Sequence, residues 1–292
     1  MSFVERLIDV TFTLASGTFA ESGTNTVKLS GLRVSAKIVK AGGNAMGTAQ
    51  IDVYGMTLSM MNKLSTLGMK VILVPRNTVT LEAGDSQNGM AVVFQGTITN
   101  AYANFDNSPD VSLYVEAHTG LTEATQFIPP TSFQGGVDAA LVMSGFAAQM
   151  GRAFVNNGVS VQLSNPHYYG SVRDQAKACA EEAGINWSLD DPLKLEIWPR
   201  DGSRGGSVPL ISPDTGMDGY PAYTPNGIMV KTLFNPSIGL GGQINVQSML
   251  TPACGTWTVY MLDHDLDSKV PDGNWFTRVS GINPSFPAPV SK

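Results

Sequence analysis

The chain has 292 residues, which is too long for one minimal core and fits two or three domains of roughly 100 residues each. Its formal net charge is −6 and it has no run of Lys or Arg, which argues against a nucleic-acid binder, because such a protein needs a basic face. Only 14% of the residues are charged while Gly and Pro are plentiful, which favours β-rich domains with many turns and a surface partly covered by partners.

Residues 1–126 have the composition of a β-barrel or sandwich of six or seven strands. A short helix is expected after Thr57, which can cap it, because apolar residues recur on one face until Gly68. The predicted strands are residues 7–14, 26–40, 48–53, 71–74, 79–82, 91–99 and 111–117. We interpret this segment as an N-terminal β-barrel or sandwich domain with one inserted helix.

Residues 127–207 alternate between helix and strand patterns, which predicts a small α/β domain followed by a linker. Ser171 and Asp174 form a predicted capping box for a helix that ends at Gly184. The glycine-rich residues 201–207 are expected to be a flexible linker. The other predicted elements are a helix over 137–150, a strand over 159–163, and a hairpin of 185–189 with 194–198.

Residues 208–283 predict a second β domain, followed by a proline-rich tail at 284–292. Polar and apolar residues alternate over 243–247, as in a strand with one wet face. Runs dense in β-branched and aromatic residues follow at 256–262 and 275–279. The candidate core residues are Trp257, Tyr260, Trp275 and Phe276, with Trp198 from the preceding domain.

Asp263, Asp265 and Asp267 alternate along the chain, as the first ligands of a calcium loop do. Ser268 stands where that loop needs glycine and Asn274 where it needs glutamate. The favoured interpretation is therefore a strand end that turns into a polar loop. We expect no metal and no other cofactor.

A hydrolase would need a nucleophile with a base, or two carboxylates with shifted pKa values. The three histidines, His118, His167 and His264, fall in three separate predicted domains. The glutamate pair at 181–182 is typical of the solvent-exposed face of a helix, and the aspartate pair at 190–191 is typical of a turn. We therefore predict no enzymatic activity and no catalytic residue.

Residues 1–10 mix charged with apolar side chains and no long apolar run follows, so we expect neither a signal peptide nor a membrane span. The two cysteines, Cys179 and Cys254, lie in different predicted domains and are expected to be reduced thiols. The chain is therefore expected to be made and kept in the cytoplasm until it is assembled.

Residues 233–277 (LFNPSIGLGGQINVQSMLTPACGTWTVYMLDHDLDSKVPDGNWFT) resemble the C-terminal barrel of baseplate hub proteins from contractile-tailed phages. The shared features are an asparagine-proline after a strand, a threonine-proline turn, and histidine-aspartate-leucine before a glycine turn and an aromatic strand. The resemblance extends to residues 209–213 and 159–166.

This resemblance implies a mainly β chain in which two tube-like barrels flank an α/β insert. It also implies a structural homotrimer in the tail of the virion, which matches the six-fold tail tube to the three-fold central spike. The implied partners are tube or tube-initiator ring proteins above, the spike protein below, and the tape measure protein in the lumen.

The alternative is a carbohydrate-binding β-rich module of a tail or cell-surface protein. Its sugar rings would stack on exposed aromatic residues gathered on one face. The available residues are Tyr168, Tyr169, Trp198, Tyr220 and Tyr223, scattered over two predicted domains.

Overall fold

The computed structural model describes residues 4–42, 45–66, 76–106, 108–189 and 193–283, and it is mainly β. The chain forms two compact units. The first contains Met1–Val39, Met46–Leu121 and Asp263–Phe276; the second contains Lys40–Ala45, Thr122–Leu262 and Thr277–Lys292. The three-domain division with boundaries at 126, 207 and 283 stays a prediction. None of the described helices is long and apolar enough to cross a membrane.

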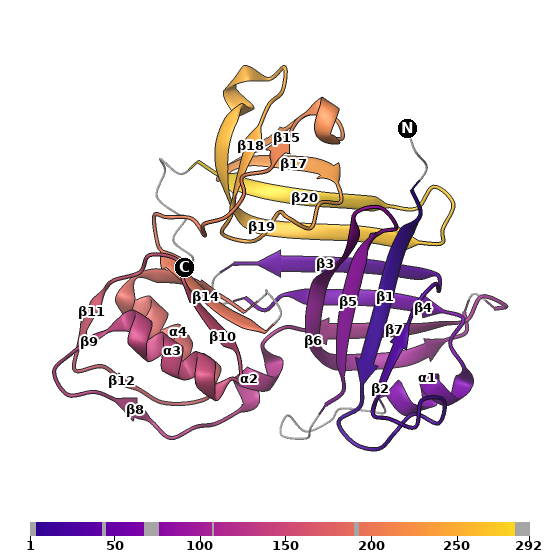
Figure 1. Ribbon diagram of the computed structural model, residues 1–292, viewed down its shortest axis with the longest axis horizontal. Helices are drawn as coiled ribbons and strands as arrows, with labels where there is room; N and C mark the ends of the chain where they lie inside the picture. The colour runs from indigo at the N-terminus through magenta and orange to yellow at the C-terminus, as the bar shows by residue number, and fades with distance from the viewer. Residues whose placement is uncertain (1–3, 43–44, 67–75, 107, 190–192, 284–292) are drawn as a thin grey trace. The chain divides into compact units, whose positions relative to one another are not determined.

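Seven antiparallel strands build the first unit, in the order β3-β4-β7-β6-β5-β1-β2. Figure 1 shows β1 and β5 running across β3, β4 and β7. The long strand β6 pairs with both β5 and β7, and its register with β7 shifts between Ile98 and Asn100. The strands are β1 (Arg6–Thr13), β2 (Thr26–Leu29), β3 (Val34–Ala41), β4 (Thr48–Tyr54), β5 (Thr78–Asp85), β6 (Gly89–Asn104) and β7 (Ser112–His118).

The predicted helix after Thr57 is confirmed as α1 (Leu58–Leu64). The Thr57 hydroxyl accepts a hydrogen bond from the Met60 amide at 3.2 Å. The predicted single strand over 26–40 is wrong, because the chain turns at Gly31 with φ +72° and forms β2 and β3 instead. The predicted strand at 71–74 and the stop at Gly68 lie outside the described residues.

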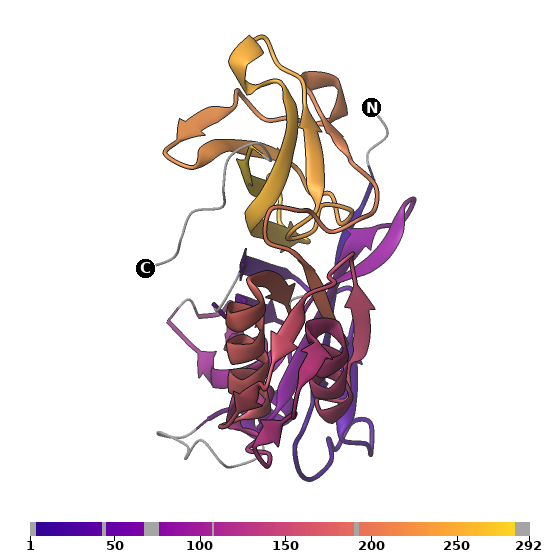
Figure 2. The same cartoon turned by 90° about the vertical axis from the view of Figure 1, so that its left-hand side faces the viewer.

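The second unit begins with an α/β part in which three helices accompany a three-stranded sheet (Figures 1 and 2). The helices α3 and α4 pack on each other and share one core with this sheet. The helices are α2 (Leu121–Thr125), α3 (Ala139–Gln149) and α4 (Val172–Ala183), and the strands are β10 (Ala153–Asn156), β13 (Ile185–Ser188) and β14 (Lys194–Pro199).

Local predictions for this part are largely confirmed. Ser171 and Asp174 form the capping box of α4, and Gly184 ends the helix with φ 62°. The hairpin of β13 with β14 is present, while its predicted turn at 190–192 lies outside the described residues. Two bounds differ: α3 begins at Ala139 because Asp138 caps it, and the strand expected at 159–163 is β11 (Gln162–Ser164).

An irregular two-stranded ribbon accompanies the helices of this part. Its strands are β8 (Thr131–Ser132) with β12 (His167–Tyr168), and β9 (Gly136–Asp138) with β11. Between the two pairs the Gly135 amide donates to the Asn165 side chain at 2.8 Å. The ribbon therefore joins residues on either side of α3 and β10.

The C-terminal β region comprises the strands from β15 onward. Most of it belongs to the second unit, while the end of β19 and the start of β20 fall within Asp263–Phe276 of the first unit. The strand β17 pairs with β16, and β18 pairs with β15 and β19. The predicted alternation over 243–247 is confirmed, since Ile244 and Val246 are buried between more exposed neighbours. The strands are β15 (Leu210–Ile211), β16 (Ala222–Thr224), β17 (Gly227–Leu233), β18 (Gln243–Val246), β19 (Gly255–Ser268) and β20 (Trp275–Ile282).

The prediction of a mainly β chain with an α/β middle part is confirmed. The strand pairing of the described residues does not show two closed barrels: the strand path is open, with β2 as its end in the first unit and β16 as its end in the C-terminal β region.

Candidate assembly surface

Three of the five predicted core aromatics, Trp198, Trp257 and Trp275, are buried, while Tyr260 and Phe276 are half-buried. The Trp257 indole donates a hydrogen bond to the Ala253 carbonyl at 2.9 Å, so its one polar atom is satisfied. The Trp257 and Trp198 side chains therefore belong to the packing of the second unit.

The Trp275 ring contributes to the packing of the first unit. The Arg6 guanidinium lies 5.8 Å from the centroid of this ring, and it also donates to the Gly273 carbonyl at 2.9 Å. Arg6 thus covers the ring and ties the start of β1 to the turn before β20.

A buried ion pair fixes the segment expected to be a flexible linker. Arg204 pairs with Glu196 of β14 at 2.7 Å, with side chains only 19% and 8% exposed. Its amide also donates to the Gly241 carbonyl at 2.7 Å. A Cβ on Gly239 would lie 2.5 Å from the guanidinium and one on Gly241 would meet the Trp198 ring. The expectation of flexibility is therefore wrong at Arg204, which joins the α/β part to the C-terminal β region.

The aspartates at 263, 265 and 267 lie inside β19, so the predicted turn into a polar loop is wrong. They are half-exposed on one face, while His264 and Leu266 are buried on the other. Asp267 accepts hydrogen bonds from the Ser35 hydroxyl and, at 2.8 Å, from the Asn274 amide. Among the described residues no group of three potential ligands converges on a metal position.

The side chains considered for catalysis have structural partners. His118 contacts the Thr99 hydroxyl at 3.3 Å. Glu182 accepts from the Tyr168 hydroxyl at 2.7 Å, and burial together with this bond raises the pKa of Tyr168. Glu181 pairs with Lys177 at 3.9 Å on the surface of α4. His167 and His264 lie on β12 and β19, and residues 190–191 lie outside the described part.

Both cysteines are free thiols. Burial raises the pKa of Cys179 to about 11, so this thiol stays protonated and unreactive at neutral pH. Cys254 is exposed in the turn before β19, where its sulfur accepts a hydrogen bond from the Ser248 amide at 3.3 Å.

The aromatic residues proposed for sugar stacking do not form one exposed platform. Tyr168 and Trp198 are buried, whereas Tyr169, Tyr220 and Tyr223 are exposed. Tyr169 follows β12, and the other two lie at β16. Of the residues proposed for sugar stacking, only Tyr220 and Tyr223 are both exposed and close to each other in the sequence.

The exposed surface with the clearest chemistry is the edge strand β16 in the C-terminal β region. Tyr220, before the strand, and Tyr223, within it, are 65% and 60% exposed. Met229 and Leu233 are exposed on one face of the neighbouring β17, on either side of Lys231, which pairs with Asp218 at 2.5 Å. We call these four residues the β16 edge. The strand itself contains no charged residue, although natural edge strands usually carry one to prevent pairing with other chains.

The described residues form a mainly antiparallel fold that leaves the uncharged edge strand β16 exposed, and such an edge can pair with another chain. The comparison with known families makes this specific. The profile of the family described as Baseplate hub gp41 matches residues 7–281, so the chain belongs to that family. The resemblance seen in the sequence is thereby confirmed.

Solved structures share the fold. The 43 kDa tail protein of prophage MuSo2 from Shewanella oneidensis has a TM-score of 0.62 at 9% identity, over 97% of this chain and 99% of that one. The E. coli c3393 protein, described as a type VI secretion component similar to the T4 tail proteins gp27 and gp5, has a TM-score of 0.56 at 13% identity, over 86% and 73%.

A chain of the Francisella PdpA–VgrG complex has a TM-score of 0.55 at 7% identity, over all of this chain and 60% of that one. No curated protein sequence matches. The family assignment makes the chain a structural component of a phage tail baseplate rather than an enzyme.

Proposed function

We propose that this baseplate hub protein acts in the virion as a homotrimer that matches a six-fold tail tube to a three-fold spike. Each chain would supply two similar β regions, one from the first unit and one from the strands from β15 onward. Three chains would then present six similar β regions to the tube above and three-fold symmetry to the spike below. A closed ring of three chains repeats each part of the chain three times. A trimer can therefore match a six-fold tail tube only if each chain supplies two equivalent parts.

The observation that carries this proposal is that one chain of the hub family contains two antiparallel β regions on either side of an α/β part. Each region has a buried core of its own, and the C-terminal β region ends in the uncharged strand β16, which a neighbour could extend. The expected partners are the tube or tube-initiator ring proteins, the spike protein and, in the lumen, the tape measure protein. The likeness to a chain of the PdpA–VgrG complex supports a partner of the spike type.

The substitution Tyr223→Lys tests this role at the β16 edge. A lysine on an exposed edge opposes strand pairing, so we expect normal folding and loss of incorporation into tails. Leu58→Lys is the matched control, because Leu58 on α1 is also 60% exposed. Incorporation is measured by immunoblot of purified tails, and the copy number by cryo-electron microscopy. A ring of six copies, or normal assembly of the Tyr223→Lys chain, would contradict the proposal.

A further inference from the structure

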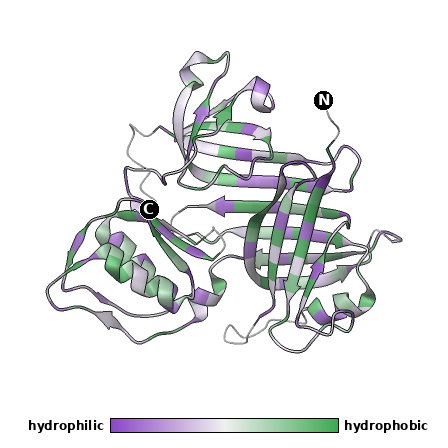
Figure 3. Cartoon of the chain, in the orientation of Figure 1, coloured by the Kyte–Doolittle hydropathy of each residue, from purple (hydrophilic) through white to green (hydrophobic). Residues whose placement is uncertain are grey.

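The surface around β16 contains no charged side chain. Residues 219–230 include no acidic or basic residue and no histidine, and Tyr220 and Tyr223 are 65% and 60% exposed among them. Asp218 and Lys231, which flank this stretch, pair with each other. Figure 3 shows how hydrophobic and hydrophilic residues alternate along the strands of this region. An uncharged edge pairs readily with other chains, so the free protein needs a cover for it until it is assembled.

The chain leaves its last strand close to this edge. In the strand order β17 lies between β16 and β20. Thr224 at the end of β16 pairs with Gly227 at the start of β17. A Cβ on Gly227 would collide with the Gly281 carbonyl oxygen, so the end of β20 lies beside the same point. Neighbouring strands are about 5 Å apart, which puts the end of β20 about 10 Å from the end of β16.

Residues 284–292 (PSFPAPVSK), which we call the tail, follow β20 and Asn283 in the sequence. Nine extended residues span about 30 Å, which is enough to reach β16 and run along it. Three of the nine are prolines. Proline has a fixed φ and no amide hydrogen, so a proline-rich segment loses little entropy on binding and does not extend a sheet further. The tail therefore has the reach and the backbone chemistry to cover a strand edge.

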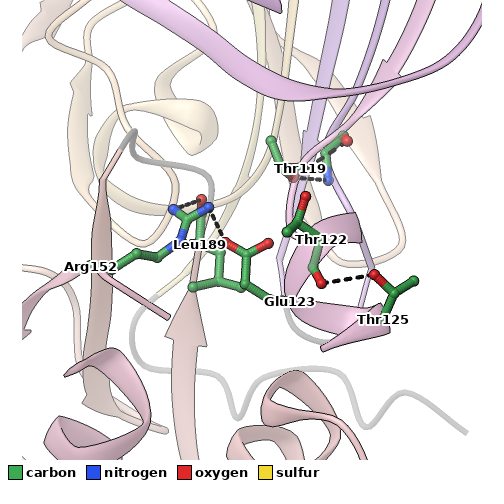
Figure 4. A network of polar contacts seen from close by, with 7 residues as sticks. Thr119, Thr122, Glu123, Thr125, Arg152 and Leu189 are labelled. Atoms are coloured by element: carbon green, nitrogen blue, oxygen red, sulfur yellow. Dashed lines mark hydrogen bonds and ion pairs between the residues drawn. The ribbon is translucent and has the colours of Figure 1, made fainter. Parts of the chain in front are cut away.

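The tail lacks the charges that fix another segment of the second unit. At α2, Glu123 pairs with Arg152 at 2.7 Å, and Arg152 also donates to the Leu189 carbonyl at 3.3 Å (Figure 4). The tail contains no acidic side chain, and its one basic residue is Lys292. Its chemistry is that of proline-rich ligands, which dock on surfaces of aromatic side chains. Tyrosine hydroxyls can also donate hydrogen bonds to the carbonyl groups of such a segment.

We propose that the tail of each chain lies across Tyr220 and Tyr223 and covers the β16 edge until the protein is assembled. The inference rests on the proposed role of this edge in assembly. Because the tail and the edge belong to one chain, the local concentration of the tail is in the millimolar range and a weak contact is sufficient to hold it. A partner that extends β16 would displace the tail. The tail thus protects the free chain from self-association and leaves the edge available in the baseplate.

Photo-crosslinking of the free, full-length chain tests the contact. Benzoylphenylalanine replaces Phe286, and trypsin, which cleaves after Lys and Arg, then releases the peptides 205–231 and 279–292. We expect a product that keeps the 30.9 kDa mass of one chain and joins these two peptides. In the control, Tyr220→Ser and Tyr223→Ser should reduce this crosslink by about tenfold, because the aromatic contacts are lost. A crosslink to other peptides, a product of twice the mass, or no crosslink would overturn the inference.

Self-association of the free chain provides a second readout. Phe286→Ser removes the largest side chain of the tail, and the loss of one aromatic contact corresponds to about a tenfold step in an equilibrium. We therefore expect this variant to form oligomers at about a tenth of the concentration that the wild type needs, as measured by sedimentation velocity. Phe286→Tyr keeps the ring and should behave as the wild type. Adding Tyr223→Lys to Phe286→Ser should reverse the effect, because a lysine opposes pairing at an edge.

Two results of this second experiment would overturn the inference. One is unchanged self-association of the Phe286→Ser chain, and the other is self-association that Tyr223→Lys does not reverse. Both experiments use the free chain, whereas the proposed function is tested by the copy number in tails. A failure of the inference is therefore distinguishable from a failure of the proposed function.

Discussion

The first unit and the C-terminal β region both end in a short strand, but the two edges differ in their chemistry. The strand β2 carries Lys28, which pairs with Asp9 at 3.0 Å and with Glu82 at 2.5 Å. The strand β16 has no charged residue and exposes Tyr223. Charged side chains on an edge oppose pairing with another chain. The difference indicates that the β2 edge of the first unit is protected against pairing with another chain, whereas the β16 edge of the C-terminal β region is suited to such pairing.

The largest expected effect concerns the core that supports the open edge. Trp257→Ala removes a buried ring and its hydrogen bond to Ala253, and should lower the free energy of unfolding by about 3–5 kcal/mol. Trp257→Phe keeps most of the volume and should cost less. Urea unfolding followed by circular dichroism measures both. An alanine variant as stable as the wild type would mean that this core contributes little to the stability of the C-terminal β region.

The next largest effect concerns the joint that holds the C-terminal β region to the α/β part. Arg204→Ala removes the guanidinium that pairs with the buried Glu196 carboxylate and should cost about 3 kcal/mol. The double variant Arg204→Ala, Glu196→Gln removes that charge and should recover part of the loss. Thermal unfolding of the three proteins gives the comparison. Equal stability of the single and double variants would show that the pair is not the source of the effect.

A smaller effect is expected at the protected edge. Lys28→Ala removes two partly exposed ion pairs and should lower the free energy of unfolding by about 0.5–1 kcal/mol. Because β2 would then lack its charge, the variant should aggregate more at high concentration. Light scattering of concentrated samples, with Lys63→Ala on α1 as the control, measures this. Equal solubility of both variants would argue against the idea that Lys28 prevents β2 from pairing with other chains.

The smallest expected effect is pH-dependent and lies on β4 of the first unit. Burial raises the pKa of Asp52, although a hydrogen bond from the Ser112 hydroxyl opposes the shift. An acid whose pKa is higher in the folded state destabilises the fold at pH values above that pKa, and the penalty disappears at low pH where both states are protonated. Asp52→Asn should therefore be slightly more stable at pH 7 and equal near pH 3. Urea unfolding at both values checks the sign.

Features that depend on a few adjacent residues were predictable. The caps at Thr57 and Ser171, the turn at Gly184 and the alternation over 243–247 each follow from local hydrogen bonding or side-chain periodicity, and all are present. Family membership was also accessible from sequence, because it rests on long matching runs. The parallel pairing of β10 with β14 was missed, since strands separated in sequence show no local sign of their partner.

The sequence by itself determined the mainly β composition, the caps, the absence of a catalytic motif and the family of this protein, because these depend on residue identity and short-range pattern. Only the tertiary structure decided that Arg204 meets Glu196, that the aspartates of β19 stay within a strand, and that β16 is exposed at the end of the strand order. Those facts depend on which distant residues come together, and long-range contacts are set by packing of the whole unit rather than by any one segment.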